Sequence, residues 1–152
     1  MRALAIALIL WFATAAVADV VTLASATIIR ADGKHIPMKL EMALDATARE
    51  QGLMHRKTLA PADGMAFFFP QKAAYKFWMK NTLIPLDMLF VDEAGRIVYI
   101  TTAKPLSLTP VGPESPVISV IEIMGGRAAR EGINVGDKVR YETQTYPGSL
   151  AR

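Results

Sequence analysis

The chain has 152 residues, with 17 basic and 14 acidic side chains and no cysteine. Its formal net charge of +3 is too small to indicate a nucleic-acid-binding protein. The absence of thiols excludes disulfides, thiol catalysis and thiolate metal sites. With only two histidines, a zinc site is not expected either, and we predict neither a metal nor a cofactor.

The first 18 residues have the pattern of a secretory signal peptide. Arg2 supplies an early positive charge, residues 3–17 form an apolar run, and Ala16 and Ala18 are small residues that suit signal peptidase. A run of about 15 apolar residues is shorter than the ~20 needed to span a bilayer. We therefore expect cleavage, a periplasmic or secreted protein and no membrane span afterwards, with an uncleaved anchor as the alternative.

Residues 19–152 predict a single β-rich domain, since 134 residues suffice for one hydrophobic core. Apolar alternation and short runs rich in β-branched or aromatic residues favour strands over residues 20–29, 36–42, 65–69, 75–79, 86–91, 96–102, 117–124 and 138–143. In the strand expected at residues 36–42, Lys39 and Glu41 fall on the face that meets water. Pro70 is expected to end the strand at residues 65–69.

One short helix is expected at about residues 45–51, because Asp45 can cap its free N–H groups and Gly52 can end it. A helical turn is expected near residues 127–131, before Gly132. Residues 104–116 contain four prolines and one glycine, which favours a long surface loop. Many short strands separated by turns predict a mainly β fold, a β-sandwich or jelly-roll-like barrel.

Polar residues interrupt two of the apolar strands. Counting alternate positions, Asp87 shares a face with Leu89 and Val91, and Glu122 shares a face with Val120 and Met124. An unpaired carboxylate in such a place costs several kcal/mol, so each should find a partner or remain protonated. The expected partners are Lys80, Asn81, Arg49 and Arg56.

Three functions fit these residues. In the first, Trp78, Lys80, Asn81, Asp87 and Arg56 surround a cleft that binds a small polar or saccharide-like ligand, with Trp78 as a flat wall. In the second, the chain is a structural or interaction module of the cell envelope in which Glu122 and Arg49 only stabilise the fold. In the third, Asp87 and Glu122 act as the acid and base of a hydrolase.

Several short motifs, in this order along the chain, resemble the domain-of-unknown-function 192 (DUF192) family. They are REQGLMHR at residues 49–56, GMAFFF at 64–69, FWMKNT at 77–82, IPLD at 84–87, VIEI at 120–123, and the pairs GG at 125–126 and GD at 136–137. The resemblance covers about residues 24–142. It implies a compact β-sandwich of jelly-roll character, and it implies no reaction, cofactor or set of catalytic residues.

Overall fold

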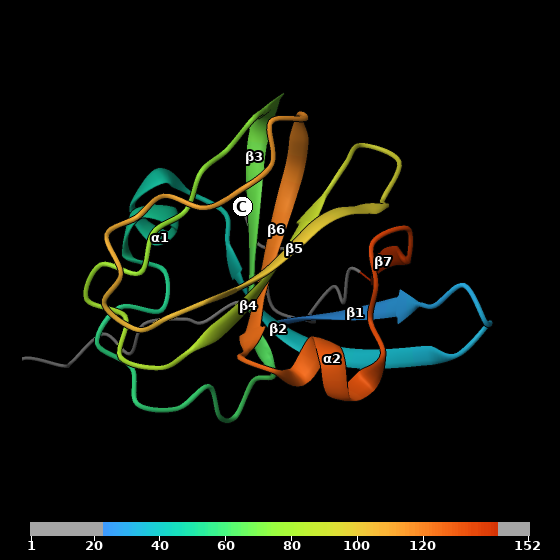
Figure 1. Cartoon of the computed structure of the whole chain (residues 1–152), viewed down its shortest axis with the longest axis horizontal. Helices are drawn as coiled ribbons and strands as arrows, with labels where there is room; N and C mark the ends of the chain where they lie inside the picture. Colours follow the sequence, from blue (N-terminus) through green and yellow to red (C-terminus); the bar gives the residue numbers. More distant parts are fainter. Residues whose placement is uncertain (1–22, 143–152) are drawn as a thin grey trace, which may run out of the picture.

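The structure, a computed structural model, describes residues 23–142 (Figure 1). Seven strands and two short helices occur in this part of the chain. In chain order they are β1 (Leu23–Ile29), β2 (His35–Ala43), α1 (Ala46–Gln51), β3 (Gly64–Ala73), β4 (Leu86–Val91), β5 (Ile97–Ala103), β6 (Val117–Met124), α2 (Arg127–Glu131) and β7 (Lys138–Glu142). The mainly β prediction, with one helix and one later helical turn, is confirmed.

The strands form one continuous sheet in the order β5-β4-β6-β3-β2-β1-β7. Neighbouring strands are antiparallel except β2 and β3, which run parallel. The two edge strands come together at one end, where Arg96 bridges Lys138 and the Val139 N–H donates to the Gly95 carbonyl over 2.7 Å. The sheet therefore curls until its edges touch, which gives it a barrel-like form.

Hydrophobic clusters cover both faces of the central strands β4, β6 and β3. One cluster joins Leu89, Ile121 and Ile123 to side chains of β1, β2, β7 and α2. The other joins Phe90, Val120 and Phe67 to residues that follow α1 and precede β4. All six residues of β4 are buried as a result, so a polar group at any central position meets apolar surroundings.

Most strand predictions are confirmed within a few residues, and two need correction. Pro70 does not end β3, because the pairing of β3 with β6 is irregular between Phe68 and Ala73, where a proline costs no ladder hydrogen bond. Residues 75–79 form no strand of the sheet. Phe77 instead bridges Val111 in the proline-rich loop.

The predicted signal peptide at residues 1–18 lies outside the described residues. Between residues 23 and 142, no helix is long and apolar enough to cross a membrane.

Asp87 is a structural acceptor rather than an exposed site residue. Its side chain is 1% exposed and accepts hydrogen bonds from the Gly126 N–H at 2.9 Å, the Ala128 N–H at 2.8 Å and the Thr102 hydroxyl at 2.6 Å. Gly126 permits this arrangement because it precedes α2 with a φ of 80°. The expectation that Lys80 or an arginine would partner Asp87 is therefore wrong.

Replacing Asp87 with alanine should destabilise the fold strongly. The change leaves two backbone N–H groups and a hydroxyl without their buried acceptor, and we expect a loss of about 3 kcal/mol or more in the free energy of unfolding. Urea unfolding followed by circular dichroism measures it. The matched control is Glu93→Ala, which breaks an exposed ion pair with Lys72 and should cost less than about 1 kcal/mol. Equal stabilities of the two variants would contradict this role of Asp87.

Candidate functional site

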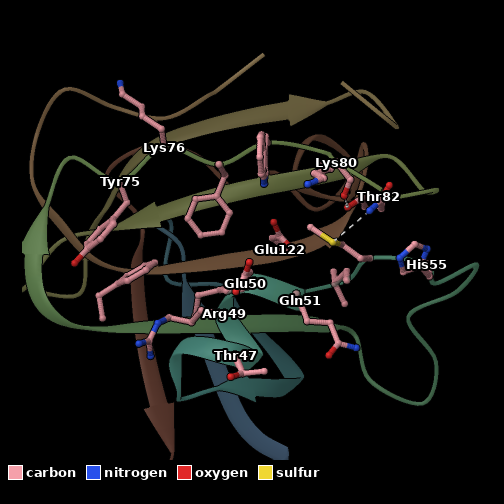
Figure 2. Close-up of a pocket in the computed structure, with 18 residues that line it drawn as sticks. Thr47, Arg49, Glu50, Gln51, His55, Tyr75, Lys76, Lys80, Thr82 and Glu122 are labelled. Atoms are coloured by element: carbon pink, nitrogen blue, oxygen red, sulfur yellow. Dashed lines mark hydrogen bonds between the residues drawn. The ribbon is translucent and has the colours of Figure 1, made fainter. Parts of the chain in front are cut away.

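A pocket of about 580 Å³ lies between α1, residues 75–82 and the sheet face formed by β3 and β6 (Figure 2). Its size falls in the range of roughly 300–1,000 Å³ common for small-molecule sites. Five aromatic side chains line it: Phe67, Phe69, Tyr75, Phe77 and Trp78. Its polar lining consists of Thr47, Arg49, Glu50, Gln51, His55, Lys76, Lys80, Asn81, Thr82 and Glu122.

Local sequence signals place α1 beside the pocket. The Asp45 carboxylate accepts the Ala48 N–H at 2.8 Å and so caps the first turn of the helix. Gly52 ends the helix with a φ of 48°, and a Cβ at this position would lie 3.2 Å from the Phe67 ring. The glycine thus allows the chain to turn tightly against the aromatic wall.

The segment after α1 is joined to the turn at Asn81. The His55 N–H donates to the Asn81 carbonyl at 2.8 Å, and both residues have positive φ, 63° and 54° respectively. The Asn81 amide also reaches the Met54 sulfur at 4.0 Å, the dashed line in Figure 2. Asparagine tolerates positive φ better than most residues, which explains its place in this turn.

The aromatic side chains pack against one another as well as lining the pocket. Phe69 and Tyr75 stack with ring centroids 3.6 Å apart, and Phe67 meets Phe77 edge to face at 5.1 Å. Such contacts hold the rings in fixed orientations. Trp78 differs, since 49% of its surface is exposed and the Lys80 amino group lies 5.2 Å from its ring centroid.

Glu122 is the buried acid of this pocket. The residue is 4% exposed, and β6 holds it between Met65 of β3 and Met88 of β4. Among the described residues no group hydrogen-bonds its carboxyl, and burial alone raises its pKa from 4.5 to about 8. At neutral pH the group is therefore mainly the protonated acid. A neutral carboxyl can both donate and accept a hydrogen bond.

The close approach of β3 to β6 at this point depends on Gly64. A Cβ there would lie 2.0 Å from the Glu122 carbonyl oxygen, so no larger residue fits without moving a strand.

A second buried acid, Glu41, lies on the same row of the sheet. Glu41 pairs with Met65, and Met65 pairs with Glu122, so one strand separates the two acids on the same face. Both guanidinium nitrogens of Arg56 contact the Glu41 carboxylate, at 2.5 and 2.7 Å. This ion pair raises the pKa of Arg56 through the Glu41 hydrogen bond.

The structure brings together only some of the predicted site residues. Trp78, Lys80 and Asn81 line the pocket, and so do Arg49 and Glu122, which were expected to be structural. Arg49 keeps a structural role too, because its guanidinium donates to the Leu44 and Phe68 carbonyls at 2.6 and 3.0 Å.

Asp87 and Arg56 do not belong to the pocket. Asp87 is bound at the start of α2 and Arg56 is held by Glu41. Asp87 pairs with Ile123 across the β4–β6 ladder, whereas Glu122 pairs with Met88, so the two carboxyl groups point to opposite faces of the sheet. They cannot act as acid and base in one cleft, and the hydrolase that uses this pair is excluded.

Sequence reasoning missed three features of the site. Glu41 was assigned to a solvated face but is 6% exposed, because residues after α1 cover this end of β2. Phe67 and Phe69 were expected only as apolar residues of a strand, and the sequence did not show that they line a pocket. Glu50, on the exposed side of α1, carries no signal in the sequence that would distinguish it from any surface residue.

The described residues contain no group of three or more histidine, aspartate or glutamate side chains that could hold a metal ion.

Comparisons with known proteins place the chain in a family without assigning an activity. No curated protein matches it. A protein from Sinorhizobium meliloti 1021, provisionally named a transcription regulator, is 37% identical, with a TM-score of 0.77 over 80% of this chain and 95% of that one. A protein of unknown function from Novosphingobium aromaticivorans DSM 12444 is 36% identical, with a TM-score of 0.75 over 85% of this chain and 94% of that one.

The profile of the DUF192 family, described as an uncharacterized ACR, matches residues 27–141. This match covers most of the chain and includes every motif named above. The chain therefore belongs to the DUF192 family.

Proposed function

We propose that this protein binds a small polar or saccharide-like ligand in the pocket between α1 and residues 75–82. The observation that carries the proposal is Glu122, a buried acid that faces the pocket without a protein partner among the described residues. Burying a polar group without a hydrogen bond costs stability, and a ligand that bonds to it would recover that cost.

The surroundings of Glu122 suit a ligand with a flat apolar face. The rings of Phe69, Tyr75 and Phe77 flank the pocket, and mutual packing fixes their orientations. Aromatic faces beside a hydrogen-bonding group are a common arrangement for binding sugar rings and similar molecules. Trp78 would cover the ligand from the rim, where its ring is half exposed.

Lys80 would contribute a polar contact at the rim. Its ammonium group lies over the Trp78 ring, and no hydrogen bond or ion pair to it occurs within residues 23–142. A long, solvated lysine of this kind can turn toward a ligand at little cost.

We also propose that the protein works outside the cytoplasm, since residues 1–18 have the features of a secretory signal. Because the domain has no cysteines, its stability in an oxidising compartment would not depend on disulfides.

A thermal-shift screen tests the binding proposal. The full chain is heated with sugars, polyols, amino acids, nucleosides and small amines, beside the variants Glu122→Gln and Trp78→Ala. A true ligand should raise the melting temperature of the parent and raise that of each variant less, because both side chains contact it. The matched control, Glu93→Gln, lies away from the pocket and should respond like the parent. A panel without hits, or hits that stabilise all four proteins equally, would contradict the proposal and favour a structural module.

The pKa of Glu122 predicts a pH-dependent stability. The unfolded carboxyl ionises above about 4.5, while the folded one keeps its proton up to about 8, so the unfolded state gains stability as the pH rises through this window. We expect the free energy of unfolding of the parent to fall, relative to Glu122→Gln, on the order of 1 kcal/mol per pH unit. Urea unfolding of both proteins between about pH 5 and pH 8 measures the difference. A difference independent of pH would refute the raised pKa.

Export predicts a defined mature chain. When the full-length gene is expressed in a bacterial host, mass spectrometry of the periplasmic fraction should detect a protein that begins at Asp19. A variant with Arg in place of Ala16 and Ala18, which disfavours cleavage, is the control. An intact chain recovered from the cytoplasm would overturn the export proposal.

A further inference from the structure

We propose that the ligand group which reaches Glu122 is an ammonium group, so that the pocket selects small organic amines, amino sugars among them. The inference rests on the proposed ligand-binding function and adds the chemical class of the ligand.

The first support is a comparison of two acids on one face of the sheet. Glu41 and Glu122 are separated by Met65 alone, and both are buried. The chain supplies Glu41 with a bidentate cation, Arg56. It supplies Glu122 with none among the described residues. A buried carboxylate needs either a cation, as Glu41 has, or several hydrogen bonds, as Asp87 has. Glu122 has neither among the described residues, and an ammonium group of the ligand would supply both.

Two of the cations that line the pocket, Arg49 and Lys76, are engaged elsewhere. Arg49 donates to the Leu44 and Phe68 carbonyls, and its guanidinium lies over the Phe69 ring at 5.8 Å. Lys76 donates to the carbonyls of Gly112 and Pro113 at 2.9 and 3.0 Å and pairs with Glu114. Figure 2 shows the Arg49 and Lys76 head groups extending away from Glu122. Lys80 lies at the Trp78 ring on the rim.

The walls of the pocket favour a positive charge as well. The faces of aromatic rings carry negative potential and attract cations within about 6 Å of the ring centroid. An anionic ligand group would be repelled by these ring faces, so it is disfavoured. A hydroxyl could bond to the neutral carboxyl, but it would gain nothing from the charge preference of the rings.

Binding an amine requires a proton to leave. At neutral pH the free site holds Glu122 as the acid and the ligand as the ammonium ion; the complex holds a carboxylate–ammonium pair, and one proton passes to the solvent. Other titratable groups that line the pocket could contribute to a pH effect, and they come from α1, the segment after it and residues 75–80: Arg49, Glu50, His55, Tyr75, Lys76 and Lys80. The experiment must separate Glu122 from these groups.

Matched pairs of probes test the charge of the ligand. Calorimetric titration of the full chain compares phenethylamine with 2-phenylethanol, glucosamine with glucose, and choline with 3,3-dimethylbutan-1-ol. We expect at least one charged member to bind about tenfold more tightly than its neutral partner, owing to the ion pair and the ring faces. In Glu122→Gln, which keeps the shape of the neutral acid, this preference should fall to about one.

Proton release identifies the acid that is responsible. Choline, or any of the amines that binds, should release close to one proton at pH 7, measured as the difference in binding heat between phosphate and Tris buffers. Its affinity should rise about tenfold per pH unit until Glu122 is ionised. Glu93→Gln is the matched control, since Glu93 is an exposed acid outside the pocket; it should keep the proton release, and Glu122→Gln should lose it.

The outcomes distinguish this inference from the proposed function. If neutral members bind as tightly as their amines, the amine inference fails and ligand binding stands. If amines bind without proton release, or if Glu122→Gln still releases the proton, Glu122 is not the contact and the inference fails. If none of the probes and none of the compounds in the thermal-shift screen binds, both proposals fail.

Discussion

The arrangement of this protein depends on the burial of its central strands on both faces. Strands β3, β6 and β4 carry apolar clusters on either side, so a carboxyl group on them loses most of its hydration and must be bonded or stay protonated. These strands carry one acid on each face, Asp87 and Glu122, and the two acids differ in their hydrogen bonding. Asp87 receives three hydrogen bonds and anchors α2, while Glu122 receives none and faces a pocket.

The same constraint explains where the pocket lies. The helix α1 has only six residues and forms one wall of the pocket. Residues 75–82 cover more of this face, and the segment is held by the proline-rich loop at Val111 and by His55. Both covering segments turn through positive φ, at Gly52 and at Asn81, and the gap between them is lined by aromatic rings. The fold thus leaves a concave, mostly apolar pocket with one buried acid, Glu122, in its wall.

Residue patterns in the sequence predicted much of this fold and part of the site. Alternation within a strand correctly placed Asp87 with Leu89 and Glu122 with Val120, and it predicted that both acids are buried. Alternation could not predict whether Asp87 and Glu122 lie on the same face of the sheet, because this depends on the register between β4 and β6. In the structure Asp87 lies opposite Ile123, one position away from Glu122, and the two acids are therefore on opposite faces. The sequence could not predict the main partners of Asp87 either, because they are backbone N–H groups, which nearly every residue type has.

Whether Glu122 is a neutral acid in the free protein decides the account, because the proposed ligand chemistry follows from it. Carbon-13 NMR of glutamate-labelled protein, with Glu122→Gln used to assign the signal, reports its ionisation directly. We expect its carboxyl carbon to keep the shift of the protonated form at pH 7 and to titrate near pH 8. A signal that is already that of a carboxylate at pH 6, with a midpoint near 4.5, would contradict the account.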